Sequence, residues 1–318
     1  MSDRKTWLVT GAAGFIGSHL VEALLKDGQV VRGLDNFATG KRANLAGFQG
    51  SADFSFIEGD ICDPAICRAA VAGVDVILHQ AALGSVPRSL VEPAKTHAAN
   101  VTGFLNMLIA AREAGVKRFV YASSSSVYGD DPELPKREER VGRPLSPYAA
   151  TKAMNEMYAG VFARQFGLET IGLRYFNVFG PRQDPEGAYA AVIPAWVAAL
   201  IRNQPVHING DGETSRDFCY VANVVQANIA AGSTISRDAV DQVYNIALGE
   251  QTTLNQLFTM LSERLGKKSK PIHQDFRSGD VRHSLADISK AQRLLHYKPT
   301  HSVSQGLDEA LDWYVKNL

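Results

Sequence analysis

The chain has 318 residues, of which 33 are basic and 33 acidic, so its formal net charge is zero. This balance, with no long run of either sign, argues against a nucleic-acid surface or a polybasic membrane patch. The sequence shows neither a secretory signal nor the roughly 18 consecutive apolar residues of a membrane span, so we expect a cytoplasmic protein with one large domain or two unequal lobes.

The first predicted strand, residues 6–10, is rich in apolar and β-branched residues and stops at Gly11, the first of three glycines spaced three positions apart. In a strand–turn–helix setting Gly11 allows the tight turn, Gly14 admits a pyrophosphate and Gly17 lets the helix pack on the strand. The helix N-terminus would then attract phosphates, although a glycine triplet alone is also found in plain tight loops. The candidate dinucleotide contacts are Gly11, Gly14, Phe15, Ile16 and Gly17.

The second predicted strand, residues 29–34, delivers an acid, Asp35, at its carboxyl end. A carboxylate there can bond an adenosine ribose and would repel a 2′-phosphate, which favours NAD over NADP. The third strand, residues 54–58, leads to Asp60, which is placed to reach the adenine edge. Asn36 and Ile61 are the adjacent candidate contacts.

Three cysteines, Cys62, Cys67 and Cys219, form an odd number in a long chain, which we interpret as reduced thiols. No histidine spacing near Cys62 and Cys67 matches a metal site, so we expect no metal.

The fourth strand, residues 74–78, is followed by His79, which we interpret as a satisfied core residue. The small residues behind it suit a backbone that runs beside the cofactor, so Gln80, Ala81 and Ala82 are candidate contacts. Asn100 lies on a long helical pattern over residues 93–114. It could hold a helix kink or a water near the site, and a plain surface position is the alternative.

The fifth strand, residues 118–122, runs into four serines at the edge where open α/β sheets bind ligands. Pro147 then favours a helix start, and Tyr148 and Lys152 share one face of that helix. A neighbouring ammonium would lower the pKa of the phenol, so Tyr148 could act as a base near neutral pH. Taken singly, a serine-rich turn and a chance Tyr–Lys pair remain alternatives.

Five alternations of strand and helix imply an α/β fold with a doubly wound parallel sheet of the Rossmann type. Residues 168–175 and 243–247 are further predicted strands. We expect residues 1–176 and about 217–248 to form an NAD-binding domain. Residues 177–216 and 249–318 would form a smaller C-terminal α/β lobe that binds substrate.

The glycine triplet, Asp35, Ser123, Ser124 and the Tyr148–Lys152 pair together resemble the extended short-chain dehydrogenase/reductase family. Within it the chain looks most similar, almost end to end, to UDP-sugar 4-epimerases. The stretches 82–89 and 209–218 and the serine run resemble the bacterial UDP-N-acetylglucosamine 4-epimerases of polysaccharide pathways.

The resemblance implies a reaction cycle and a role for each catalytic residue. Ser124 would bond the sugar 4-oxygen, with Ser125 and Ser126 on the same side, and Tyr148 would be the base. Lys152 would bond the nicotinamide ribose and lower the pKa of Tyr148. The 4-keto sugar would turn in the pocket and take the hydride back on its other face, leaving a tightly bound NAD unchanged; Tyr175 is a further candidate NAD contact.

The resemblance also implies a binding site for the UDP-sugar. It assigns Asn177, Arg216 and Arg277 to the diphosphate, where guanidinium groups make bidentate contacts. Ion pairs of Arg216 with Asp217 and of Arg277 with Asp280 are the alternatives, and Asp280 could instead hold the uridine ribose. The other candidate substrate contacts are Gly84, Ser85, Arg88, Ala191, Val192, His207 and Ser284.

Serines at positions 125 and 126 replace the carboxylate with which related dehydratases and decarboxylases assist their chemistry, which favours epimerisation. By the same resemblance, Ser284 matches the position where similar epimerases restricted to non-acetylated sugars carry a bulky aromatic. Its small hydroxyl would leave room for a 2-acetamido group, so we expect UDP-GlcNAc/UDP-GalNAc interconversion, with UDP-Glc/UDP-Gal weaker. Alternatives are a UDP-uronate paired with Arg88 and a non-catalytic NAD-binding sensor. By resemblance we also expect a homodimer packed through helices at 93–114 and 148–166.

Overall fold

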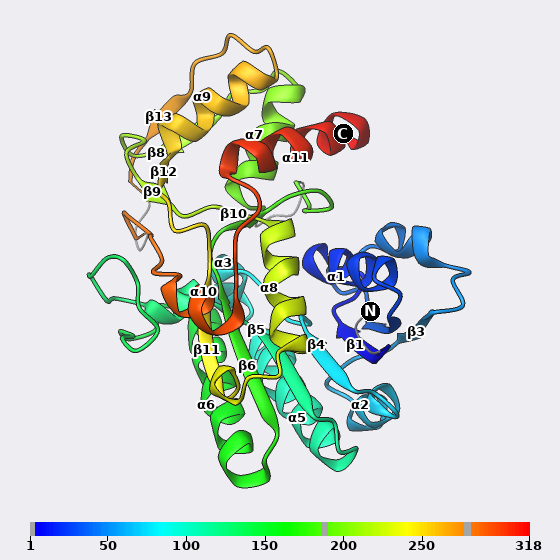
Figure 1. Ribbon diagram of the computed structural model, residues 1–318. Helices are drawn as coiled ribbons and strands as arrows, with labels where there is room; N and C mark the ends of the chain where they lie inside the picture. The colour runs from blue at the N-terminus through cyan, green and yellow to red at the C-terminus, as the bar shows by residue number, and fades with distance from the viewer. Residues whose placement is uncertain (1–3, 186–189, 277–280) are drawn as a thin grey trace.

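The computed structural model describes residues 4–185, 190–276 and 281–318, and its centre is a seven-stranded parallel sheet (Figure 1). The spatial order, with bounds, is β11 (Gln242–Ile246), β6 (Glu169–Tyr175), β5 (Arg118–Ser124), β4 (Val76–His79), β1 (Thr6–Thr10), β2 (Val30–Asp35) and β3 (Phe54–Glu58). The order reverses between β1 and β4, where open α/β sheets bind ligands. The predicted doubly wound sheet is therefore confirmed.

Helices cover both faces of the sheet (Figure 1). On one face lie α1 (Phe15–Lys26) and α8 (Val221–Ser233), and on the other lie α2 (Pro64–Val71), α5 (Gly103–Glu113) and α6 (Pro147–Phe166). Side chains alternate along β1, so that Trp7 and Val9 join the first core and Leu8 joins the second. Burial on both faces explains why the strands read as nearly continuous apolar runs.

The predicted helix over residues 93–114 consists of three pieces. They are α4 (Pro93–His97), a π-helical turn η2 (Ala98–Thr102) and α5, with the short helix α3 (Val86–Val91) before them. A π-turn commonly marks a functional position in a helix. Helix α6, in contrast, begins at Pro147 as predicted, and the Ser146 hydroxyl caps it by accepting from Ala149 N at 3.1 Å.

A smaller lobe gathers beyond one end of the sheet (Figure 1). Helices α7 (Val192–Ile201), α9 (Leu254–Arg264) and α11 (Val303–Asn317) enclose a third core there. Three two-stranded ladders complete it: β7 (Val178–Phe179) with β10 (Cys219–Tyr220), β9 (Ser215–Arg216) with β12 (Thr252–Thr253), and β8 (His207–Asn209) with β13 (Ile272–Gln274). The remaining short helices are η1 (Arg42–Phe48), η3 (Ser125–Tyr128) and η4 (Arg237–Ala239).

The C-terminal tail contributes to two cores, whereas the sequence analysis assigned all of it to the smaller lobe. Helix α10 (Ser289–Leu295) places Ala291 and Leu295 in the core formed by α1 and α8, while α11 packs in the lobe. Within the described residues, none of the helices combines the length and apolarity needed to cross a bilayer.

A buried ion pair joins α6 to the sheet. Arg174 donates two hydrogen bonds to Glu156, from Nε to Oε1 at 2.9 Å and from Nη2 to Oε2 at 2.8 Å. The Ser123 hydroxyl donates to the same carboxylate at 2.5 Å. Arg174 Nη1 donates to the Tyr128 hydroxyl at 3.0 Å, which donates to Asn245 Oδ1 at 2.6 Å. The network therefore fixes β5, β6, β11 and α6 to one another.

We expect the substitution Glu156→Ala to lower the free energy of unfolding by about 3–5 kcal/mol, because it leaves the buried Arg174 charge without its partner. The measurement is urea unfolding of both proteins. Asp53→Ala is the control, since it removes the carboxylate of an exposed pair with Arg4 and should cost less than about 1 kcal/mol. Equal losses in the two variants would show that the Glu156 pair contributes no more than a surface pair.

Candidate active site

The glycine turn after β1 brings three stretches of backbone into close contact. Gly11 has φ of +68°, and a Cβ there would lie 2.9 Å from Ala81 N. A Cβ on Gly17 would lie 2.0 Å from the carbonyl oxygen of Gly11, so helix α1 can approach β1 only with glycine at this position. No side chain caps α1 at Gly14. The turn therefore offers bare backbone and a helix N-terminus, which suits a pyrophosphate.

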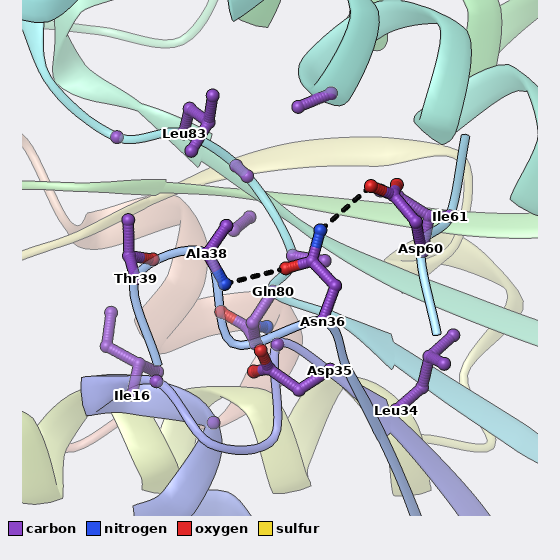
Figure 2. Close-up of a pocket in the computed structure, with 18 of the residues that line it drawn as sticks. Ile16, Leu34, Asp35, Asn36, Ala38, Thr39, Asp60, Ile61, Gln80 and Leu83 are labelled. Carbon is purple, nitrogen blue, oxygen red and sulfur yellow. Dashed lines mark hydrogen bonds between the residues drawn. The ribbon is translucent and has the colours of Figure 1, made fainter. Parts of the chain in front are cut away.

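Two carboxylates follow the turn at the ends of β2 and β3. Asp35 is buried and accepts hydrogen bonds from Ala13 N at 2.9 Å and Phe37 N at 2.7 Å. Burial raises the pKa of Asp35, and the backbone N–H groups partly oppose that rise. Figure 2 shows Asn36 between them, donating to Asp60 Oδ2 at 2.9 Å. Burial acts to raise the pKa of Asp60, but hydrogen bonds from Cys62 N and Asn36 outweigh it and lower that pKa.

These elements enclose a pocket of about 470 Å³ at the carboxyl edge of the sheet. Every predicted cofactor contact except Asn100 lines it: Gly11, Gly14, Phe15, Ile16, Gly17, Asp35, Asn36, Asp60, Ile61, Gln80, Ala81, Ala82, Tyr148, Lys152 and Tyr175. The glycine turn, the paired acids and the volume fit a dinucleotide, because phosphates, ribose and an aromatic base each find matching groups.

Sequence reasoning missed several residues of this pocket. Thr39, Lys95, Ala98 and Ala99 line it but come from a loop and from the α4–η2 junction, which no strand-end pattern marks. The sequence signal that could have indicated this part of the pocket is the pair of small residues directly before Asn100, Ala98 and Ala99. Asn228, which supports two pocket residues from behind, was missed as well: its Oδ1 accepts from Gln80 at 3.0 Å, and its Nδ2 donates to the Tyr175 hydroxyl at 2.8 Å. An asparagine inside the apolar pattern of α8 could have indicated it.

Asn100 lies behind the pocket wall rather than on it. It is buried in the π-turn, so the surface alternative is wrong. Its Oδ1 accepts from Leu83 N at 2.7 Å, and its Nδ2 donates to Leu83 O and to Thr151 Oγ1 at 3.2 and 3.1 Å. Asn100 therefore joins the loop after β4, which carries pocket residues, to the helix that bears Tyr148 and Lys152.

His79 and the cysteines agree with their sequence interpretation. His79 is buried, hydrogen-bonds Thr10 Oγ1 at 3.0 Å and stacks on Phe119, and burial lowers its pKa to about 3. Cys62, Cys67 and Cys219 are free thiols. Among the described residues, no group of three His, Cys, Asp or Glu side chains is arranged to hold a metal ion.

Tyr148 and Lys152 lie in the first two turns of α6, facing the end of β5. Lys152 Nζ donates to the Ala122 carbonyl at 2.7 Å and lies 6.0 Å from the centroid of the Tyr148 ring. Burial lowers the pKa of Lys152 to about 8, against the opposing charge of Glu156. Ser124, at the end of β5, interacts with the Tyr148 phenol and acts to lower its pKa.

The sequence analysis predicted that Lys152 lowers the pKa of Tyr148. In the protein without bound ligands this prediction is wrong. Burial raises the pKa of Tyr148, and the interaction with Ser124 only partly opposes this. The reason is that Lys152 directs its ammonium to the Ala122 carbonyl, so the cost of burying a phenolate outweighs any attraction.

The predicted substrate contacts divide into separate groups. Gly84 lines the pocket, Ser85 caps α3 ahead of Arg88, and Ser125 and Ser126 form η3, with Ser126 donating to Ser124 Oγ at 2.9 Å. In the smaller lobe, Ala191 and Val192 start α7 and His207 lies in β8, where Gln274 Nε2 contacts its ring at 2.9 Å. Arg277 and Asp280 lie outside the described residues.

Three other substrate candidates lie close to one another. Arg216 Nη1 donates to Ser215 O and Arg282 O at 3.0 and 3.2 Å, and Ser284 N donates to Ser215 O at 3.1 Å. Asn177, in the left-handed region with φ of +34°, donates to the Asp217 carbonyl at 3.1 Å. The Asp217 carboxylate itself accepts from backbone N–H groups, which does not match its suggested role as an ion-pair partner of Arg216.

Comparisons with known proteins agree with this geometry. Residues 7–247 match the NAD dependent epimerase/dehydratase family. The UDP-glucose 4-epimerase of Mycolicibacterium smegmatis is 37% identical, and the match covers 96% of this chain and 97% of that protein.

Two solved structures share the fold along nearly the whole chain. A UDP-N-acetylglucosamine 4-epimerase from Methanobrevibacter ruminantium, in complex with UDP-N-acetylmuramic acid, superposes with a TM-score of 0.94 at 39% identity and covers 99% of both chains. A UDP-glucuronic acid 4-epimerase from Bacillus cereus, in complex with UDP-glucuronic acid and NAD, superposes with a TM-score of 0.91 at 33% identity, covering 98% of this chain and 100% of that one.

Proposed function

The chain belongs to the NAD-dependent epimerase/dehydratase family, and we propose that it interconverts UDP-GlcNAc and UDP-GalNAc by inverting carbon 4 of the sugar. NAD is its cofactor, and its relatives support UDP-sugar 4-epimerase activity in general. The observation that carries the proposal is that Tyr148 and Lys152, one helical turn apart on α6, both line the dinucleotide pocket at the serine-bearing end of β5.

In this site each residue has a defined task. Ser124 donates a hydrogen bond to the sugar 4-oxygen, and Tyr148 accepts the proton of the 4-hydroxyl and later returns it. Lys152, fixed by the Ala122 carbonyl one helical turn from Tyr148, is the residue that would hold the nicotinamide ribose. NAD, when bound, supplies a reversible acceptor for the hydride of carbon 4. The proton and the hydride both return to the sugar, so the reaction needs no external reductant.

The surroundings favour epimerisation over elimination or decarboxylation. Dehydration of the keto sugar needs an additional acid near carbons 5 and 6, but positions 125 and 126 are serines in η3. The carboxylate of Glu156 is engaged by Arg174 and Ser123. The keto sugar is therefore expected to be reduced again. A UDP-uronate remains the second candidate substrate, because a relative of the same fold is a UDP-glucuronic acid 4-epimerase.

We propose that the exposed apolar surface of α3 and α6 binds a second copy of the chain. Large exposed apolar residues lie on α3 and α6, which contact each other: Leu90 is 63% exposed, Val91 71% and Met157 63%. The sequence analysis also expected residues 93–114 at the interface; in α5, Phe104, Met107 and Leu108 lie in the core, whereas Leu105 and Ile109 are only partly buried. An apolar surface of this kind is typical of a protein–protein contact.

We expect Tyr148→Phe to reduce epimerisation by about 10²–10⁴-fold, because it removes the group that accepts the proton. The assay incubates purified protein with UDP-GlcNAc and no reductant and resolves UDP-GalNAc by chromatography. NAD content and thermal stability of the variant serve as controls. Undiminished epimerisation would show that Tyr148 is not the base, and undiminished biological activity of the variant would support a non-catalytic NAD-binding role. 4-Keto-6-deoxy sugar or carbon dioxide among the products would contradict epimerisation.

Replacing Ser284 with Tyr is expected to abolish turnover of the acetylated UDP-sugars while turnover of UDP-Glc and UDP-Gal persists. The physical reason is volume, since the phenol ring would occupy the space proposed for the 2-acetamido group. Initial rates on the two sugar pairs give the comparison. The exposed Ser236→Tyr is the matched control. If Ser284→Tyr changes both pairs equally, the residue does not select the substituent.

Met157→Glu is expected to convert a dimer into a monomer, because it places a charge in an apolar contact. Light scattering after size exclusion measures the mass. Val315→Glu, at an exposed apolar position on α11 in the other lobe, should leave the dimer intact. A monomeric unaltered protein at micromolar concentration would refute the proposed interface.

A further inference from the structure

Asp217 is a buried carboxylate at the joint between the sheet and the smaller lobe, and the catalytic cycle does not use it. Its side chain is fully buried. Oδ1 accepts from Leu248 N at 2.9 Å, and Oδ2 accepts from Gly249 N at 3.1 Å and Ala286 N at 3.2 Å. A single carboxylate therefore holds the loop that follows β11 and the segment that follows Ser284.

The proposed substrate residues of the smaller lobe are attached to the same point. Arg216 precedes Asp217 in the chain, and the Asn177 side chain donates to the Asp217 carbonyl. Ser284 lies two residues before Ala286, and its own N–H bonds Ser215. Thus Asn177, Arg216 and Ser284 sit on three segments whose relative positions depend on the hydrogen bonds of Asp217.

We propose that Asp217 is a positioning residue for the UDP-sugar, which holds Arg216 and Ser284 in register with the end of the sheet without touching the substrate. This inference rests on the proposed function. An amide cannot replace the carboxylate, because its NH₂ group would face backbone N–H donors that need an acceptor. Loss of the charge should therefore weaken substrate binding and leave proton transfer at Tyr148 intact.

The positioning role of Asp217 can also be tested by changing the pH, because its carboxylate is titratable. Burial raises the pKa of Asp217 to about 7; the three N–H groups oppose the rise, and Glu250 adds to it. The other ionisable groups close by are Arg216, Cys219 and Tyr297, with His283 on the adjoining segment. Protonation turns one acceptor oxygen into a donor, so the hydrogen bonds weaken as the pH falls below about 7.

The test is Asp217→Asn in the full chain with its NAD, assayed with UDP-GlcNAc at about pH 8. We expect KM to rise roughly tenfold, as for the loss of a buried charged hydrogen bond, with kcat within about twofold and NAD content unchanged. Asp53→Asn, which changes an exposed carboxylate far from the lobe, is the control. An unchanged KM, or a loss confined to kcat, overturns the inference.

A second measurement decides the matter if Asp217→Asn does not fold. For the unaltered protein, KM for UDP-GlcNAc should rise several-fold between about pH 8 and about pH 6, a range in which a diphosphate diester does not titrate. A constant KM overturns the inference. In a folded Asp217→Asn protein the dependence should vanish, and its persistence would assign it to another group such as His283. Absence of any UDP-sugar turnover by the unaltered protein would instead overturn the proposed function.

Discussion

The buried pair between Glu156 and Arg174 is the interaction on which the catalytic end of the molecule depends. It lies where α6 crosses β5 and β6, and its carboxylate also holds Ser123, the residue before Ser124. A charge taken out of water is costly unless it is paired and fully hydrogen-bonded, so this pair admits few alternative arrangements. The same helix carries Tyr148 and Lys152, and their distance from the serine edge of β5 is therefore fixed by a contact that takes no part in the chemistry.

A second carboxylate, Asp217, has the corresponding task in the smaller lobe, but with different partners. Glu156 is neutralised by a guanidinium, whereas Asp217 is held by three backbone N–H groups. Without a countercharge, burial raises the pKa of Asp217 to about 7. Helix α6, which carries Tyr148 and Lys152, is consequently attached to the sheet by an ion pair. The smaller lobe is attached by hydrogen bonds that depend on whether Asp217 is ionised.

The fold alone does not select the sugar. Relatives that act on UDP-glucose, UDP-N-acetylglucosamine and UDP-glucuronic acid match this chain almost end to end. Specificity therefore depends on individual side chains rather than on the scaffold, as is common when one fold hosts several activities. Ser284 is the residue that we propose for this choice, and its backbone N–H donates to the carbonyl of Ser215.

The elements that could be predicted from the amino-acid sequence are those whose signal is local. Strand runs, the glycine turn and Pro147 predicted the doubly wound sheet and the start of α6, because steric limits on glycine and proline act within a few residues. Those same patterns placed Asp35, Asp60 and the Tyr148–Lys152 pair at one edge. The tertiary structure alone decided that Asn100 binds Leu83 and Thr151 and that burial raises the pKa of Tyr148. It also showed that α10 packs in the core formed by α1 and α8 rather than in the smaller lobe. Each of these depends on groups distant in the chain, whose approach and desolvation no local pattern encodes.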